Sequence, residues 1–215
     1  MGVLIENADK VLSGFLNTLG LFAVSGLSAL VIGTLVAAMR VSPIPVLRGV
    51  GTFYVGFFRN TPLLVLLILT VFGLPELGVN PSFFVKSCLA MSCYTAAFVC
   101  EALRSGVNSI AMGQAEAARS VGMRFGTTMT QIVLPQALRA VVPPLASVLI
   151  ALVKNTSLAS SFGILEATAR MKGLINDDPS ALWFIFLGIA LGYVVIVELI
   201  SLLSASLERR WRVAR

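Results

Sequence analysis

The chain contains no histidine, and this absence removes a large class of chemistry. Histidine is the side chain that changes charge near neutral pH and the commonest ligand of transition metals. Ser-His-Asp triads, histidine bases and histidine-containing zinc sites are therefore excluded. Cysteine is scarce too: Cys88, Cys93 and Cys100 lie in or near one apolar stretch without CxxC spacing. This pattern favours small, reduced, buried residues over a metal site or a disulfide, and no catalytic or metal-binding residue is predicted.

Charge is the second shortage, because only 12% of the 215 residues are charged while 57% are hydrophobic and mean hydropathy is +0.93. A soluble domain has about a quarter of its residues charged. This chain has too little polar surface to cover a soluble core. Its net charge of +6 does not indicate nucleic-acid binding, because the basic residues form short clusters between apolar runs. The composition predicts an all-α integral membrane protein in contact with lipid.

Five apolar stretches are long enough to cross a bilayer, since a transmembrane helix needs about 20 mostly apolar residues. They run over roughly Phe15–Met39, Val55–Leu74, Phe83–Leu103, Ala137–Val153 and Ala181–Leu207. The fourth is the weakest prediction because Pro143-Pro144 interrupts it, and a break is tolerated only where freed backbone groups meet protein or water. No internal repeat or low-complexity linker divides the chain, so we expect one transmembrane domain over residues 1–215.

The positions of the basic residues predict how the spans are oriented. Bases gather in the first and third connections and in the C-terminal tail, at Arg40, Arg48, Arg59, Arg104, Arg119, Arg124, Arg139, Arg209, Arg210, Arg212 and Arg215. The alternate connections are poorer in bases or balance them with acids. With an odd number of spans, this distribution predicts an outside N-terminus and a cytoplasmic C-terminus in the cell membrane.

A polar, basic segment, Glu116–Pro135, separates the third and fourth spans. Its composition predicts a short helix over Glu116–Gly122, with Gly122 suited to end it. A helical pattern resumes over Met123–Ile132, and Pro135 is tolerated near the start of the next span. On the cytoplasmic side, such a segment is either a docking element for a soluble partner or an interfacial amphipathic helix without one.

The tetrapeptide Arg59-Asn60-Thr61-Pro62 stands at the start of the second span. One interpretation is structural: the arginine reaches toward the interface, and the next residues cap a helix that begins at the proline. The other interpretation is a lining of the substrate path or a contact with a partner chain.

A second polar tetrapeptide, Lys154-Asn155-Thr156-Ser157, follows the double proline and an apolar run. Four consecutive polar residues near membrane depth are costly unless they face protein or an aqueous cavity. Broken helices whose ends meet substrate recur in transporters. We therefore favour a gate or substrate-path role over an ordinary span end. For an anionic substrate, Lys154 and Arg59 would offset a carboxylate while the neutral residues donate hydrogen bonds.

Two acidic residues lie in or beside the last spans. Glu166 belongs either to a gating segment or to a solvated surface, and we expect the solvated position. Glu198 is the only carboxylate inside the fifth span, and an intramembrane acid is expected to have a partner. A packing contact with another helix or a second chain is the expectation, with a functional role as the alternative.

The spacing of the polar segment resembles the EAA signature of ABC-type importer permeases. The matching order is Glu116-Ala117-Ala118, three residues, Gly122, nine residues, Ile132, one residue, and Leu134-Pro135. Further matching blocks are GQAEAARS, LPQALRAVVPPL, FFRNTPLLVLL and ALVKNTSLAS. Over nearly its whole length the chain is similar to polar amino acid uptake permeases, especially glutamate-type members.

The resemblance implies the type I ABC importer permease fold, with about five transmembrane helices and a cytoplasmic coupling helix within about 113–135. Two cytoplasmic ATPase subunits would drive alternating access, alongside a second permease chain, identical or related, and an extracytoplasmic substrate-binding protein. The residues that would couple to the ATPase are Ala115, Glu116, Ala117, Ala118, Arg119, Gly122, Ile132, Leu134 and Pro135. No Walker A motif, GxxxxGK[ST], occurs here, so ATP and magnesium would bind the partner and this chain would hold no cofactor.

The predicted function is therefore the permease subunit of an amino acid importer, for glutamate first and aspartate or glutamine next. A secondary transporter is the first alternative, and it would require inverted repeats. A channel would require a ring of filter residues, and a membrane enzyme would require paired carboxylates or metal ligands. Co-purification with an ATPase would separate these classes.

Overall fold

The computed structural model describes residues 2–211, so Arg212 and Arg215 of the predicted basic tail lie outside the described residues. Four helical stretches are long and apolar enough to span a membrane. They contain α2 (Ala8–Val41), α6 (Phe83–Asn108), α9 (Leu134–Asn155) and α11 (Leu182–Trp211). The remaining elements are α1 (Gly2–Glu6), α3 (Pro45–Asn60), α4 (Leu63–Ile68), η1 (Leu69–Gly73), α5 (Leu74–Glu76), α7 (Met112–Ser120), α8 (Phe125–Thr128), η2 (Met129–Val133), η3 (Thr156–Phe162), α10 (Ala167–Asp177) and η4 (Pro179–Ala181).

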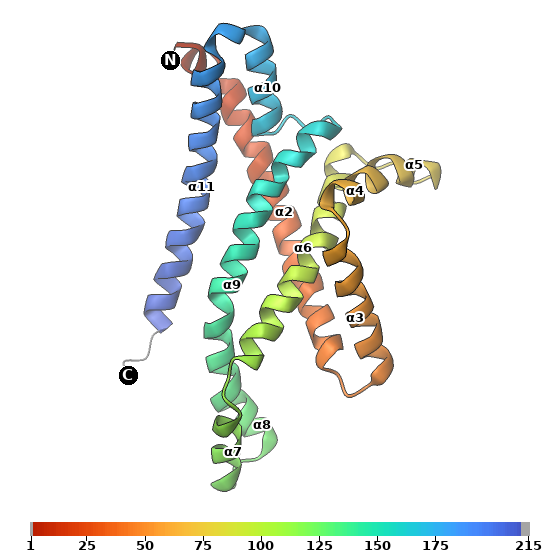
Figure 1. Cartoon of the computed structure of the whole chain (residues 1–215), viewed down its shortest axis with the longest axis vertical. Helices are drawn as coiled ribbons and strands as arrows, with labels where there is room; N and C mark the ends of the chain where they lie inside the picture. Colours follow the sequence, from red (N-terminus) through yellow and green to blue (C-terminus); the bar gives the residue numbers. More distant parts are fainter. Residues whose placement is uncertain (1, 212–215) are drawn as a thin grey trace.

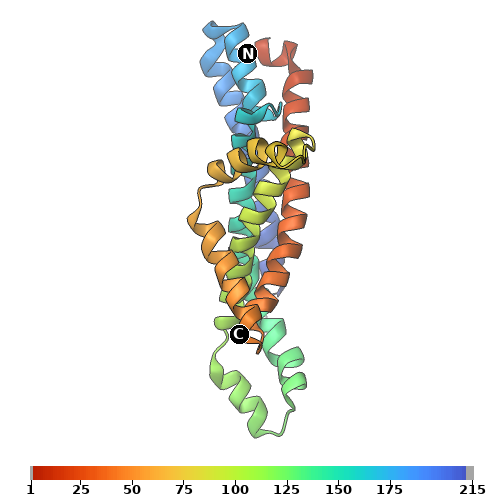
Figure 2. The same ribbon diagram turned by 90° about the vertical axis from the view of Figure 1, so that its right-hand side faces the viewer.

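The helices form an elongated bundle whose two ends differ in structure. In Figure 1, α3, α6, α9 and α11 follow one another across the bundle, and α2 packs against α6, α3 and α10. Helices α1 and α10 lie at one end, while α7 and α8 lie at the other end, beyond the last turn of α11. Figure 2 shows α7 and α8 projecting beyond the long helices. The multi-pass membrane architecture expected from composition is confirmed.

Small residues bring the central helices close together. A Cβ atom added at Gly33 of α2 would lie 2.6 Å from Val99 of α6, and one added at Gly106 of α6 would collide with Val141 of α9. Ala29 and Ala96 are fully buried in the same region. Close approach of backbones replaces the hydrophobic driving force that is weak between helices in lipid.

The second predicted span, Val55–Leu74, is wrong as a continuous helix. The structure has a helix pair, Pro45–Asn60 and Leu63–Glu76, bent by 101° at Thr61-Pro62. Proline disfavours helical geometry in the residue before it, and Thr61 is extended at φ −100° and ψ 127°. The apolar run conceals this bend because both arms of the pair are hydrophobic.

The predicted interruption at Pro143-Pro144 is also wrong, because α9 is helical from Leu134 to Asn155 across both prolines. Two backbone donors are missing there, and the carbonyls one turn earlier lose their usual partners. The helical stretch containing α9 extends over 38 residues, from Phe125 to Phe162.

Candidate functional site

The predicted docking segment forms a knob, defined here as α7, α8 and their connection, at one end of the bundle (Figure 2). α7 begins at Met112, four residues before the predicted helix at Glu116, and ends at Ser120. Glu116, Ala117 and Arg119 are exposed, Ala115 is half-buried, and Ala118 is buried. A cleft of about 90 Å³ separates the two short helices and is lined by Ala115, Arg119, Phe125, Thr128, Met129 and Val133.

Gly122 ends α7 in a left-handed conformation, at φ +83°. The Gly122 amide donates to the Arg119 carbonyl at 3.0 Å, and the Met123 amide donates to the Ala118 carbonyl at 3.1 Å. This pair of bonds is the Schellman motif, for which glycine is the usual residue. No atom lies within 4 Å of a Cβ added at Gly122, so the backbone conformation, not space, is what a larger residue would oppose.

The rest of the predicted coupling set lies where the knob joins the long helix. Ile132 belongs to the π-helical turn η2, and Leu134-Pro135 begins α9. Gln136 donates a 2.8 Å hydrogen bond to the Ile132 carbonyl, four residues earlier. These residues connect the knob directly to α9.

Sequence reasoning missed three exposed apolar side chains on the knob. Met112, Val121 and Phe125 are exposed by 79%, 77% and 76%. The sequence could have revealed them, because large apolar residues inside a polar segment are expected to be buried against another surface. Together with the charged Glu116 and Arg119, they give the knob a mixed surface of the kind found at protein interfaces.

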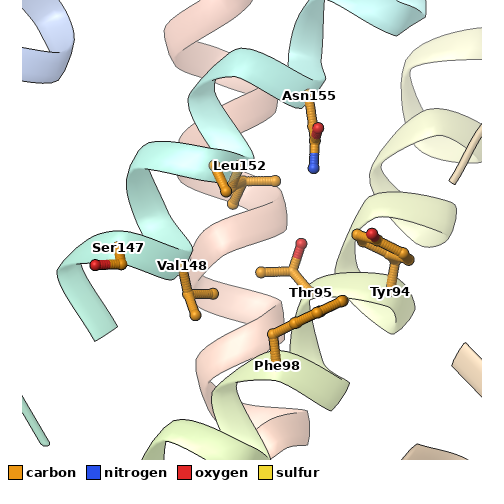
Figure 3. Close-up of a pocket in the computed structure, with 8 residues that line it drawn as sticks. Tyr94, Thr95, Phe98, Ser147, Val148, Leu152 and Asn155 are labelled. Carbon is orange, nitrogen blue, oxygen red and sulfur yellow. The ribbon is translucent and has the colours of Figure 1, made fainter. Parts of the chain in front are cut away.

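The second tetrapeptide divides between two cavities. Asn155 faces a cavity of about 340 Å³ between α6 and α9, shown in Figure 3. Its lining residues are Tyr94, Thr95, Phe98, Ser147, Val148, Ala151, Leu152 and Asn155. The Asn155 amide, the Thr95 hydroxyl and the Tyr94 ring lie on facing sides of this cavity in the figure. We call it the α6–α9 cavity.

Lys154 and Ser157 face the other way. They line a cavity of about 370 Å³ together with Thr168, Met171, Phe186, Ile189, Ala190 and Tyr193. Thr156 is fully buried and donates a 2.6 Å hydrogen bond to the Val153 carbonyl. We predicted that all four residues of this tetrapeptide would line one path. In the structure they do not, because two cavities and a buried position divide them.

The first tetrapeptide brings Arg59 into an ion cluster. Its guanidinium lies 3.6 Å from a Glu101 carboxylate oxygen, and Arg40 and Arg104 also contact Glu101. Arg59 also stacks on Phe98, 5.6 Å from the ring centre. Because Phe98 lines the α6–α9 cavity, Arg59 lies behind one wall of it. Arg59 and Lys154 do not flank one site as expected.

The other residues of the first tetrapeptide shape the bend. The Thr61 hydroxyl donates a 2.8 Å hydrogen bond to the Phe57 carbonyl in the last turn of α3. Asn60 and Pro62 are exposed, and none of the three side chains lines the α6–α9 cavity.

Comparison with known proteins decides the family. Residues 29–213 match the family described as "Binding-protein-dependent transport system inner membrane component". The chain belongs to this family. It is 38% identical to the glutamate transport system permease protein GluC of Corynebacterium glutamicum, over 96% of both chains. It is 34% identical to the glutamate/aspartate import permease protein GltJ of Escherichia coli K12, over 93% of this chain and 86% of that one.

Solved structures agree on the fold. The crystal structure of an amino acid ABC transporter with histidines superposes with a TM-score of 0.89 and 29% identity, over 96% of both chains. The MetNI methionine ABC transporter, in an inward-facing conformation, gives a TM-score of 0.73 at 21% identity, over 95% of this chain and 97% of that one. The predicted type I importer permease fold is confirmed.

Glu166 and Glu198, the two acidic residues considered near the last spans, have opposite surroundings in the permease. Glu166 was expected in solvent, and this expectation is wrong: the side chain is fully buried. It caps α10 by accepting from the Thr168 and Ala169 amides at 2.9 and 2.8 Å, and it accepts from the Tyr193 hydroxyl at 2.7 Å. Glu198 is exposed on α11, and no hydrogen bond or ion pair reaches it from any described residue.

Lys86 is a further residue of the permease that sequence reasoning missed. Its side chain is 3% exposed, and its ammonium donates to the Val71 carbonyl at 3.3 Å and to Asn80 at 2.7 Å. Val71 is four residues before Pro75, which has no amide hydrogen to offer that carbonyl. Lys86 thus supplies the donor and fastens the bent α4–α5 arm to α6.

Proposed function

We propose that this permease is the translocation subunit of an ATP-driven amino acid importer in the cell membrane. Glutamate is the first candidate cargo, and aspartate or glutamine come next. The observation that carries the proposal is the single 38-residue helical stretch Phe125–Phe162, which contains part of the knob near one end and Asn155 of the α6–α9 cavity near the other. The glutamate and glutamate/aspartate permeases among the relatives support the choice of cargo.

In this proposal residues 1–215 form one transmembrane domain whose coupling segment, 113–135, faces the cytoplasm. The N-terminus is then outside and the C-terminus is inside. The knob's Glu116, Ala117, Ala118 and Arg119 dock on a cytoplasmic ATPase, which holds ATP and magnesium. A second permease chain and an extracytoplasmic substrate-binding protein complete the complex.

The knob transmits force because it is connected to α9 without a flexible linker. Closure of two ATPase subunits brings two knobs together, and each knob moves the base of its own α9 through Ile132 and Leu134-Pro135. The π-helical turn η2 and the double proline are the points where this helical stretch bends most easily. The two permease chains then alternate between conformations that open inward and conformations that open outward.

Cargo in this proposal crosses beside the α6–α9 cavity. Asn155, Thr95 and Ser147 offer hydrogen bonds, and Arg59 behind Phe98 contributes positive potential. One carboxylate, Glu101, is shared by three arginines, so the region keeps an excess of positive charge that suits an acidic amino acid. Lys154 and Ser157 belong to the gate around the second cavity, and Thr61-Pro62 sets the bend beside Arg59.

Uptake measurements test this function. The complete complex, reconstituted in liposomes with its binding protein, is offered a panel of labelled amino acids with and without internal ATP. We expect glutamate uptake that requires ATP. Uptake that is driven by an ion gradient alone would instead favour the secondary transporter, and uptake without any gradient or ATP requirement would favour a channel.

A further inference from the structure

The cleft between α7 and α8, named here the knob cleft, combines apolar walls with two polar groups. Phe125, Met129 and Val133 supply the large apolar side chains, while Arg119 and Thr128 supply the polar ones. Its volume of about 90 Å³ exceeds the roughly 30 Å³ that one water molecule occupies in the liquid. The knob cleft therefore has room for the end of one side chain and is too small for a helix.

The hydroxyl of Thr128 indicates that the knob cleft receives a group from another molecule. Thr128 is 4% exposed, and its hydroxyl oxygen is buried without a hydrogen-bond partner among residues 2–211. By contrast, the Thr130 hydroxyl donates to the Gly126 carbonyl at 2.8 Å, which is the usual bond of a threonine within a helix. Since buried polar groups in native proteins are nearly always hydrogen-bonded, Thr128 needs a partner that these residues do not supply.

Arg119 is the second group in the knob cleft with donors to spare. Its only hydrogen bond among residues 2–211 is a 3.4 Å contact from Nε to the Ala115 carbonyl of its own helix. Glu116, the only acidic residue between Met112 and Thr128, forms no ion pair within the described chain, and no carboxylate lines the cleft. A guanidinium and a hydroxyl that share one cleft suit an acceptor with negative charge.

The position of the knob favours a soluble partner over lipid. Helices α7 and α8 project beyond the long helices (Figure 2), so the knob cleft lies away from the surfaces that face the bilayer. Phe125, which lines the cleft, is 76% exposed and offers such a partner an apolar contact beside the charged one.

We propose that the knob cleft receives one aspartate or glutamate side chain of the cytoplasmic ATPase. The carboxylate accepts hydrogen bonds from the Arg119 guanidinium and the Thr128 hydroxyl, while the carbon stem of the side chain packs against Phe125 and Met129. This assignment rests on the proposed function, in which the knob binds the ATPase, and it adds the chemical class of the residue that the ATPase must present.

A titration of detergent-purified permease with its purified ATPase tests the pairing without any transport assay. Arg119→Gln should raise the Kd about thirtyfold and Thr128→Val about tenfold, because each removes a donor to a buried carboxylate. The matched controls are Arg124→Gln, which removes the same charge from the knob, and Thr127→Val. Neither control residue lines the cleft, so each should change the Kd less than about threefold.

Thr128→Val also separates a binding role from a structural one. Valine keeps the shape of threonine and removes a buried hydroxyl that has no partner in the free chain, so the melting temperature of the free permease should stay constant or rise. A lower melting temperature would mean that the hydroxyl stabilises the knob itself, and this result would overturn the proposal.

A charge exchange identifies the partner residue. Arg119→Glu should abolish ATPase binding, and replacing one exposed acidic residue of the ATPase with arginine should restore it. Restoration at no acidic position, or equal effects of the cleft variants and their controls, would overturn the proposal while the unmodified permease still bound its ATPase. An unmodified permease that binds no ATPase would instead refute the proposed function, and the cleft assignment with it.

Discussion

The two polar tetrapeptides Arg59–Pro62 and Lys154–Ser157 share their first three residue types: a base, an asparagine and a threonine. The first stands at a 101° bend between two helices, and the second lies inside a helical stretch that continues into η3. The difference follows from the fourth residue. Pro62 holds Thr61 in an extended conformation, whereas Ser157 keeps its amide and allows helical geometry at Thr156.

The bases of the two tetrapeptides differ in their partners. Arg59 is fastened by Glu101 and by the Phe98 ring, while Lys154 faces a cavity with no carboxylate among its lining residues. Similar sequences therefore produce a bend held by an ion pair in one place and a continuous helix with a cation facing a cavity in the other. The comparison teaches that a single residue, proline or serine at the fourth position, decides the backbone geometry of these segments, and that the surrounding residues decide what their bases contact.

Ser157→Pro should have the largest effect, because it imposes the first tetrapeptide's geometry on the second. Proline inside a helix costs about 3 kcal/mol or more, and Thr156 would leave its helical conformation. We expect a large loss of thermal stability and of transport. Ser157→Ala is the control, since it removes only the 2.7 Å hydroxyl bond to the Lys154 carbonyl. Equal melting temperatures for the two variants would contradict the comparison.

Glu166→Gln should have the next largest effect. Glu166 caps the helix that follows the second tetrapeptide, and the first tetrapeptide has no such support. An amide group cannot accept every bond that the carboxylate accepts, so we expect a loss of about 1–3 kcal/mol of unfolding free energy. Calorimetry of the purified permease measures this loss. Glu76→Gln, at an exposed position, should change little; a similar change in both variants would show that the buried cap is unimportant.

Asn155→Ala should raise the apparent KM for uptake about tenfold, since one hydrogen bond to cargo is worth about 1 kcal/mol or slightly more. Lys154→Ala should change KM less, because Lys154 faces the other cavity. Uptake and substrate-stimulated ATP hydrolysis by the reconstituted complex measure both. If neither variant changes either activity, the substrate-path assignment fails; if Lys154→Ala has the larger effect, the second cavity is the path.

Arg59→Lys should have the smallest effect. The charge near Glu101 remains, while the planar contact with Phe98 is lost, and partly exposed pairs and stacks of this kind contribute about 0.5–1 kcal/mol. We expect a small fall in melting temperature and uptake that stays near normal. A loss as large as that of Ser157→Pro would mean that the bend held by the ion pair is itself a binding element.

Sequence periodicity and composition were sufficient for the features that depend on nearest neighbours. The long apolar runs located α2, α6 and α11, and Gly122 located the end of α7. Periodicity and composition were insufficient where contacts between residues distant in the sequence determine the position of a side chain. Consecutive helical residues point about 100° apart, so Lys154 and Asn155 reach different cavities, and only the packing of α6 and α11 shows which. Glu166 was misplaced because its partner Tyr193 is 27 residues away.

Prolines were misread for a related reason. Pro62 breaks a helix pair that is apolar on both sides, so hydropathy shows one span. Pro143-Pro144 suggests a break, yet the surrounding residues keep α9 helical. The cost of a missing donor depends on whether another residue replaces it, as Lys86 does at the Val71 carbonyl, and this is a tertiary property.

The central claim is that the knob binds a cytoplasmic ATPase and that Gly122 maintains the conformation of the knob. Its most direct test is the amount of ATPase that co-purifies with Gly122→Val, Gly122→Asn and Gly78→Val. Gly78 has the same left-handed backbone, at φ +77°, and open space around it, but it lies at the connection between α5 and α6.

A β-branched residue in this conformation costs of order 1–3 kcal/mol, and asparagine tolerates it best after glycine. We therefore expect that Gly122→Val loses the ATPase and ATP-dependent uptake, while Gly122→Asn and Gly78→Val retain both. Full ATPase recovery and normal uptake with Gly122→Val would contradict the account.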